Sequence, residues 1–176
     1  MPLLSRRLVL AVLALVAIAA CGGPATTTTA EEEMMDEDVL AVAAAQGDLT
    51  TFLAALEAAG IMEDFHGEGP YTLFIPTDDA FADYLGTAGM SQEEVFAGAE
   101  MLQGILNYHI VDMLEDSEMV MGMAGQSFTT LSGLPLQVTV EGDIVMVGNA
   151  TVERYDLEAS NGVIHVIDMV LIPPEA

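Results

Sequence analysis

YTLFIPTDDAF, residues 71–81, is the stretch that decides the fold. Its first five residues are apolar or β-favouring and predict a strand, which a proline ends. Thr77 or Asp78 then caps a helix that runs to about Leu85, with Asp79 in the first turn, where a negative charge suits the helix dipole. The stretch therefore predicts a strand, a tight turn and a helix in immediate succession.

Two further stretches follow it along the chain. LNYHIV, residues 106–111, contains the pair Tyr108-His109, and ASNGVIHVIDMVLIPP, residues 159–174, contains an Asn-Gly turn and then a long apolar run. In this order and at this spacing, the three stretches resemble those of the fasciclin-like (FAS1) domain, and the resemblance covers residues 36–174. It implies a wedge-like antiparallel β-sandwich with helices packed along one edge. It also implies a module for adhesion and interaction that has no catalytic centre.

Helical patterns fill the first part of this region. Alanine-rich apolar stretches at 39–45 and 49–59 predict two helices, and we expect Asp48 to cap the second and Gly60 to end it. A serine followed three residues later by a glutamate, the signature of a capping box, precedes a further helix at 99–108.

Strand patterns fill the last part. The stretch 115–124 fits either a short helix or a loop, and after it the chain changes character. Short apolar runs separated by glycine-containing turns predict strands at 127–131, 136–140, 144–147, 150–155 and 163–171. Helices first and strands later indicate an α+β domain built around antiparallel sheet. No segment repeats, so we expect a single domain.

The first twenty residues have the pattern of an export signal. Arg6 and Arg7 precede an uninterrupted apolar run at 8–20, which is too short to span a bilayer as a helix, since that takes roughly 20 apolar residues. We therefore predict a signal peptide over 1–20.

Cys21 directly follows this run. The small residues before it resemble a lipobox, which implies cleavage at Cys21 and a diacylglycerol thioether on its sulfur; the alternative is an ordinary signal peptide with an incidental cysteine. Two or more acyl chains hold a protein stably at a membrane. Residues 21–35 are rich in threonine and glutamate and predict a disordered tether, ahead of a domain at 36–174 and a tail at 175–176.

The composition is strongly acidic. The chain has 28 Asp and Glu residues against three Arg and no Lys, a net charge of −25. Loss of Arg6 and Arg7 with the signal leaves Arg154 as the one basic residue against 28 acidic ones, a net charge of −27. Phosphate backbones are bound by Lys and Arg, so this balance excludes nucleic acid as a partner held by charge. Self-repulsion also destabilises a compact state unless salt screens it, which favours a salt-loving source over an ordinary one.

The histidines and carboxylates do not form a catalytic pattern. The apolar surroundings of Tyr108-His109 predict a buried, hydrogen-bonded pair, although the resemblance places this motif in a segment linked to cell-surface receptor binding. His165 alternates onto one strand face with its apolar neighbours and is expected in the core, whereas His66 is expected in an exposed loop. Helix capping accounts for the pair Asp78-Asp79. No nucleophile elbow, phosphate loop or metal-ligand spacing is present, so we predict neither an enzyme nor a cofactor.

Met119, Met121 and Met123 support an alternative function. Thioethers suit Cu(I), so an extracytoplasmic metal-binding protein is the second hypothesis. The competing explanation is that the chain has 12 methionines, a residue that fills irregular gaps in cores. The spacing fits a strand face or an irregular loop better than one face of a helix.

We therefore expect a surface-anchored, non-catalytic adhesion or matrix-interaction module, outside the cytoplasm at the cell surface or in a periplasm. Its expected partners are cell-surface or matrix proteins or polysaccharides, with the membrane reached through the lipid. The segment 112–117, directly after Tyr108-His109, is acidic where many family members carry a basic residue. Calcium or magnesium bridging carboxylates is therefore an expected mode of contact.

Overall fold

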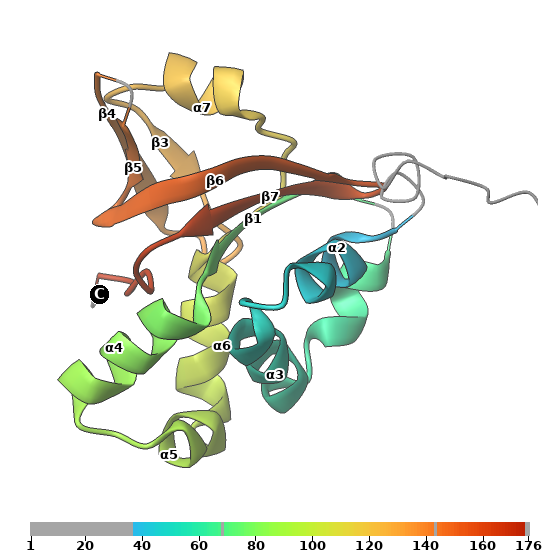
Figure 1. Ribbon diagram of the computed structural model, residues 1–176, viewed down its shortest axis with the longest axis vertical. Helices are drawn as coiled ribbons and strands as arrows, with labels where there is room; N and C mark the ends of the chain where they lie inside the picture. The colour runs from blue at the N-terminus through green and yellow to red at the C-terminus, as the bar shows by residue number, and fades with distance from the viewer. Residues whose placement is uncertain (1–36, 68, 143, 175–176) are drawn as a thin grey trace, which may run out of the picture.

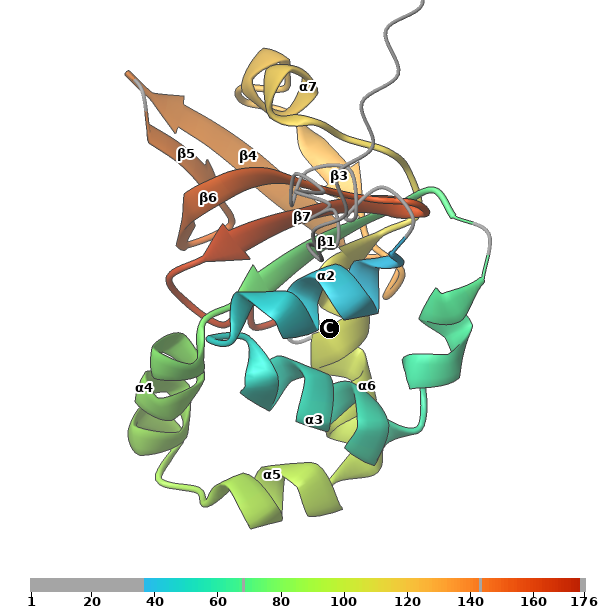
Figure 2. The ribbon, with the colours of Figure 1, turned by 45° about the vertical axis from the view of Figure 1, so that its right-hand side comes forward.

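Helices gather on one side of a curled sheet (Figure 1). The computed structural model describes residues 37–174 except 68 and 143; the predicted signal peptide at 1–20, Cys21, the whole predicted tether at 21–35 and the predicted tail at 175–176 lie outside this part. The helices on this side are α2 (Val39–Gln46), α3 (Thr50–Ala59), the 3₁₀ turn η2 (Met62–His66), α4 (Asp78–Ala88), α5 (Gln92–Ala97) and α6 (Ala99–Tyr108). The short helix α7 (Ser117–Gly122) lies on the other side of the sheet (Figure 2).

The strands form one sheet that closes almost into a barrel. They are β1 (Tyr71–Pro76), β2 (Ile110–Val111), β3 (Ser127–Thr129), β4 (Pro135–Glu141), β5 (Ile144–Val147), β6 (Ala150–Ala159) and β7 (Gly162–Ile167). Their order is β2-β1-β7-β6-β5-β4-β3, and all pairs are antiparallel except β1 with β7. A bridge between Val111 and Thr130 joins the two ends of this order. The predicted α+β class is confirmed, and the parallel pair is a feature that the strand pattern did not predict.

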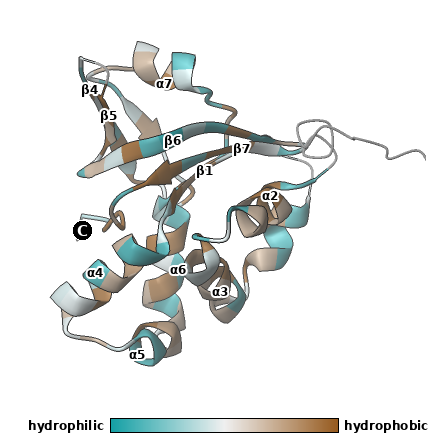
Figure 3. Ribbon diagram, viewed as in Figure 1, coloured by the Kyte–Doolittle hydropathy of each residue, from teal (hydrophilic) through white to brown (hydrophobic). Residues whose placement is uncertain are grey.

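The central strands β1 and β7 divide the interior into two cores. Leu73 and Ile75 of β1 face the helices together with Ile164 and Val166 of β7. The intervening Phe74 faces the inside of the curled sheet, where apolar residues of β4, β5 and β6 meet it. Period-two alternation explains the division, because successive side chains of a strand point to opposite faces. Both faces are covered, so β7 is buried along its whole length and both strands are strongly apolar (Figure 3).

The start of the parallel pair requires glycine. Tyr71 lies opposite Gly162, and the Tyr71 amide donates to the carbonyl of Asn161 at 3.0 Å. A Cβ placed on Gly162 would lie 2.2 Å from the carbonyl oxygen of Tyr71, a contact that real Cβ atoms do not make. The two strands therefore approach each other here more closely than any side chain would allow.

Several predicted helix ends are confirmed. The hydroxyl of Thr77 accepts from the amide of Ala80 at 3.2 Å and caps α4. Ser91 and Glu94 form a capping box at α5, and Gly60 ends α3 in the left-handed conformation, with φ 70°.

The predicted cap of α3 is wrong. Asp48 does not cap this helix; its carboxylate pairs instead with Arg154 at 2.5 Å. Asp78 supplies the cap from the start of α4, accepting from the Thr51 amide at 2.7 Å and the Thr50 hydroxyl at 2.8 Å. Burial alone would raise the pKa of Asp78, but these hydrogen bonds outweigh it and lower the pKa.

The last strand is shorter than its apolar run predicts. The run 163–171 continues past Ile167, but the strand ends there. The Asp168 carboxylate accepts from the Thr151 amide at 2.6 Å, and the Asp168 amide donates to the Thr151 carbonyl at 3.0 Å. These bonds hold Asp168 against β6, and the chain beyond it leaves the sheet.

None of the described helices is long and apolar enough to cross a membrane.

Replacing Gly162 by alanine tests the close approach of β1 and β7. We expect Gly162→Ala to lower the free energy of unfolding by about 3 kcal/mol or more, because its Cβ would meet backbone that cannot move aside. Gly104→Ala is the matched control: it lies within α6 with no atom close to its added Cβ. The control should be neutral or more stable by up to about 1 kcal/mol. Urea unfolding of both variants measures the difference, and equal stabilities would contradict the constraint.

Candidate functional site

His109 lies in the interior and is fully hydrogen-bonded. Its side chain is 0% exposed. Nδ1 lies 2.8 Å from the carbonyl oxygen of Ile105 and donates to it, because a carbonyl only accepts. Nε2 accepts from the Leu171 amide at 2.9 Å. The ring is therefore neutral with its proton on Nδ1, and it joins the end of α6 to the C-terminal segment.

The surroundings of His109 do not favour its charged form. Its ring packs edge-on against Phe52 of α3, with ring centroids 5.7 Å apart. Burial lowers the pKa of His109 to about 4, although the hydrogen bond to Ile105 acts in the opposite direction. The ring stays uncharged at neutral pH and is closed to any external substrate or metal.

Tyr108 is also packed inside and has a partner. Its hydroxyl donates to the Pro135 carbonyl at 3.1 Å, and burial raises its pKa. The pair Tyr108-His109 thus lies where the apolar surroundings predict. The role of this motif in interaction stays a prediction, and it would act through the surface that the two rings support.

His165 is a second neutral core histidine, of the opposite tautomer. Its Nε2 donates to the Glu115 carbonyl at 2.8 Å, and its ring stacks on Phe74 with centroids 5.4 Å apart. Burial lowers the pKa of His165, with the bond to Glu115 and the charges of Asp156 and Asp116 opposing it. His165 therefore holds the segment before α7 against the sheet.

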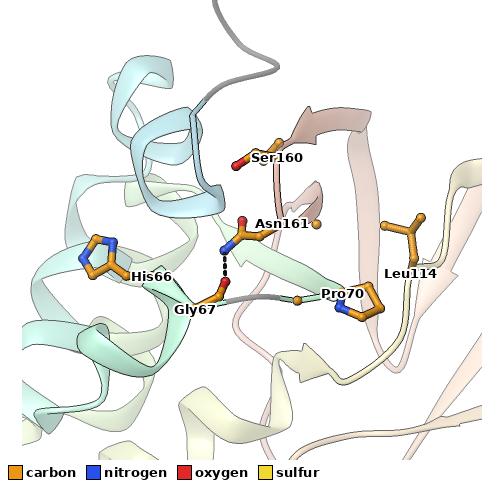
Figure 4. A pocket seen from close by; sticks show the side chains of 9 residues that line it. His66, Gly67, Pro70, Leu114, Ser160 and Asn161 are labelled. Carbon is orange, nitrogen blue, oxygen red and sulfur yellow. Dashed lines mark hydrogen bonds between the residues drawn. The ribbon is translucent and has the colours of Figure 1, made fainter.

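Asn161 joins three elements at the other end of β7. Its Oδ1 accepts from the Val39 amide at 2.9 Å, and its Nδ2 donates to the carbonyls of Phe65 and Gly67 at 2.8 Å and 3.0 Å. The side-chain amide is thus used on both sides, between the start of α2 and the end of η2 (Figure 4).

A wide hollow of about 590 Å³ lies beside Asn161. Figure 4 shows Ser160, Pro70 and Leu114 around it. His66, at its border, is half-exposed as predicted, and its Nδ1 lies 2.6 Å from a carboxylate oxygen of Asp38. The side-chain amide of Asn161 and Nδ1 of His66 are already paired within the domain, so the hollow offers few free groups for a ligand.

Two further hollows adjoin each other beside α4. The smaller, of about 250 Å³, lies between α4 and the C-terminal segment 168–172. The other, of about 430 Å³, is lined by six acidic residues: Asp48, Asp78, Asp79, Asp83, Glu153 and Asp168. The sequence did not predict either hollow, because each collects residues from elements far apart in the chain. Within residues 37–174, apart from 68 and 143, no three His, Cys, Asp or Glu side chains are arranged to hold a metal ion.

The three methionines of the copper hypothesis lie on and just after α7, not on a strand. At about 100° per residue, Met121 points to the opposite side of the helix from Met119 and Met123. Met119 and Met121 are exposed, whereas Met123 packs against the core inside the sheet. This arrangement does not converge the three thioethers, and the copper hypothesis stays untested; competition with a Cu(I) chelator would test it.

Comparison with known proteins identifies the family. The model of the fasciclin domain matches residues 47–173. The chain belongs to the fasciclin family. Protein sll1483 of Synechocystis sp. is 39% identical over 137 residues, which cover 77% of this chain and 73% of that protein. Immunogenic protein MPB70 of Mycobacterium bovis is 33% identical over 143 residues, 78% of this chain and 70% of that protein.

Larger proteins contain similar domains. Human periostin is 37% identical over 133 residues, which cover 75% of this chain but only 15% of periostin. A solved FAS1 domain pair from the insect cell adhesion molecule fasciclin I superposes with a TM-score of 0.58 at 23% identity, covering 74% of this chain and 47% of that one. This likeness confirms the FAS1 fold that the three sequence stretches imply.

The buried state of His109 predicts a pH-dependent stability. Its pKa is about 4 in the folded fasciclin domain against an ordinary value of 6.5, so the unfolded chain binds the extra proton first as pH falls. The stabilising effect of His109 is complete above pH 6.5 and declines by about 3 kcal/mol towards pH 4. We expect His109→Gln to be less stable than wild type at pH 7 by about 1–3 kcal/mol, since one hydrogen bond is lost.

The advantage of wild type over His109→Gln in unfolding free energy should shrink as pH falls below 6.5 and should reach zero or change sign by about pH 4, because only the wild type titrates at this position. Urea unfolding of both proteins in molar NaCl, which screens the carboxylates that also titrate, measures this difference. A difference that is constant with pH would contradict the neutral, buried state of the ring.

Proposed function

We propose that this fasciclin domain is a surface-anchored, non-catalytic module for cell adhesion or matrix interaction. The observation that supports the proposal is that the polar residues of the family motifs form hydrogen bonds within the domain. His109, His165 and Asn161 all hydrogen-bond to other parts of the same domain. The groups that remain available to other molecules are those of the outer surface, which suits binding better than catalysis. The insect molecule with the same fold is named for cell adhesion.

The partners that we propose are cell-surface or matrix proteins or polysaccharides. The carboxylates of the mature chain outnumber its single arginine by 28 to one, so an anionic polysaccharide would need calcium or magnesium to bridge the two. A cationic partner would need no bridge. The same charge favours salt-rich surroundings, where repulsion within the domain is screened.

Lipid on Cys21 would place the domain at a membrane outside the cytoplasm. The apolar run before Cys21 and the threonine-rich stretch after it suit a signal and a tether. We expect the chain produced in its own host to incorporate an alkyne-labelled fatty acid, and Cys21→Ser to incorporate none. Labelling that persists in Cys21→Ser would contradict an anchor at this cysteine.

Envelope binding tests the function itself. We expect the purified chain starting at Gly22 to sediment with envelope fragments of its own host, saturably and without chemical change in either. Binding that is lost in excess chelator indicates cation bridging, and binding that persists indicates direct contact. The assay is run at low and at molar NaCl, with the melting temperature of each sample measured in parallel. No saturable binding at any salt concentration would contradict an adhesion module.

A further inference from the structure

The smaller hollow beside α4 is an apolar socket. Its floor includes Ala80 of α4 and Val170 of the C-terminal segment, each 4% exposed, and Tyr84 packs at its side. Met169 and Ile172 stand at its border with 46% and 57% of their surface exposed. Large apolar side chains that gather around one hollow, rather than scatter singly, typically mark a contact surface.

Both walls of the socket are held in place without a ligand. Asp168 is fixed to Thr151 of β6 by two hydrogen bonds, and the Thr77 amide at the start of α4 donates to the Ile167 carbonyl at 3.2 Å. A socket that is already formed costs less ordering on binding than a flexible one. Its volume of about 250 Å³ lies below the roughly 300–1,000 Å³ of typical small-molecule pockets, which suits one or two protein side chains.

Acidic residues lie directly beside the socket. Asp83 and Asp168 line both the socket and the larger acidic hollow beside it. Three of the carboxylates in that hollow already have partners. Asp48 pairs with Arg154. Asp78 accepts hydrogen bonds from Thr50 and Thr51, and Asp168 accepts one from Thr151. The remaining carboxylates, those of Asp79, Asp83 and Glu153, make no hydrogen bond or ion pair with the part of the chain that the structure describes.

The carboxylates beside the socket favour a cationic binding partner. A second copy of this chain would bring more carboxylates to an acidic rim, and its single arginine of the mature chain, Arg154, is already paired with Asp48. A cationic partner gains from the same rim, because complementary charge speeds encounter and disfavours like-charged competitors. The apolar floor further requires a side chain such as leucine or methionine among the partner's basic residues.

We propose that the socket between α4 and residues 168–172 docks a cationic protein segment, with an apolar side chain in the socket and Lys or Arg against Asp83, Asp79 and Glu153. The proposal rests on the proposed function, since it names the partner chemistry for one surface of an interaction module. We expect the apolar contact to contribute to affinity at every salt concentration, and the carboxylates to contribute only at low salt.

Peptide binding to the chain starting at Gly22 tests the proposal. The probe is a short fluorescein-labelled peptide of alternating lysine and leucine, compared by fluorescence anisotropy with a lysine–serine peptide and a glutamate–leucine peptide. We expect the lysine–leucine peptide to bind at least about tenfold more tightly than either, which corresponds to the removal of one good contact. Equal affinity for the lysine–serine peptide would overturn the socket, and equal affinity for the glutamate–leucine peptide would overturn the role of charge.

Matched variants locate the contact. Ile172→Ser should weaken binding about tenfold, whereas Ile144→Ser, at an equally exposed isoleucine on β5 outside the socket, should leave it within about twofold. Asp83→Lys should weaken binding at low salt but not in molar NaCl. Asp112→Lys is its control: it makes the same change in charge at an exposed position outside the socket, and it should weaken binding much less. Equal effects within either pair would overturn the assignment. So would a wild-type dimer in light scattering that Ile172→Ser abolishes, because the occupant would then be a second copy.

The two proposals fail separately. If wild type binds envelopes and Ile172→Ser binds them equally well, the socket is wrong and the adhesion function stands. If the lysine–leucine peptide binds with the expected pattern while envelopes are not bound, the socket stands and the adhesion function is wrong.

Discussion

The parallel pairing of β1 with β7 unites two parts of the chain that are distant in sequence. β1 opens directly into α4, and β7 leads directly into the C-terminal segment, so the pair positions both walls of the socket. Its register depends on backbone contact at Gly162 and on the side chain of Asn161, which reaches α2 and the end of η2 at once. Displacing this junction would separate the helical core from the sheet core, because both cores share the two strands.

The two buried histidines connect neighbouring segments to the same part of the fold. His109 joins α6 to the segment after β7, and His165 joins β7 to the segment before α7. They carry their protons on different ring nitrogens because each ring must satisfy one carbonyl and one amide in a fixed place. A single ring nitrogen left without its partner would be a buried polar group without compensation, which is costly. Both histidines therefore stabilise the fold of the domain.

Local interactions were predictable from the sequence, and long-range ones were not. The capping box of Ser91 with Glu94 and the left-handed end at Gly60 involve residues within a few positions of each other, so their spacing identified them. The exchange of roles between Asp48 and Asp78 was missed, because either aspartate could cap α3 and only the tertiary arrangement selects Asp78. The socket and the acidic hollow were missed for the same reason. Composition gave the total charge, but the position of free carboxylates beside exposed methionine and isoleucine appears only when α4 and residues 168–172 meet.

An apolar socket beside free carboxylates also suits a domain of extreme charge. At about 0.1 M salt the Debye length is about 10 Å, so the acidic rim attracts cations from beyond contact; at about 1 M it is about 3 Å, and only touching groups interact. A partner recognised by charge alone would therefore dissociate at molar salt. Burial of apolar surface is not weakened by this screening, since it depends on water and not on charge. A surface that combines the two retains affinity where salt is high and gains speed of encounter where salt is low.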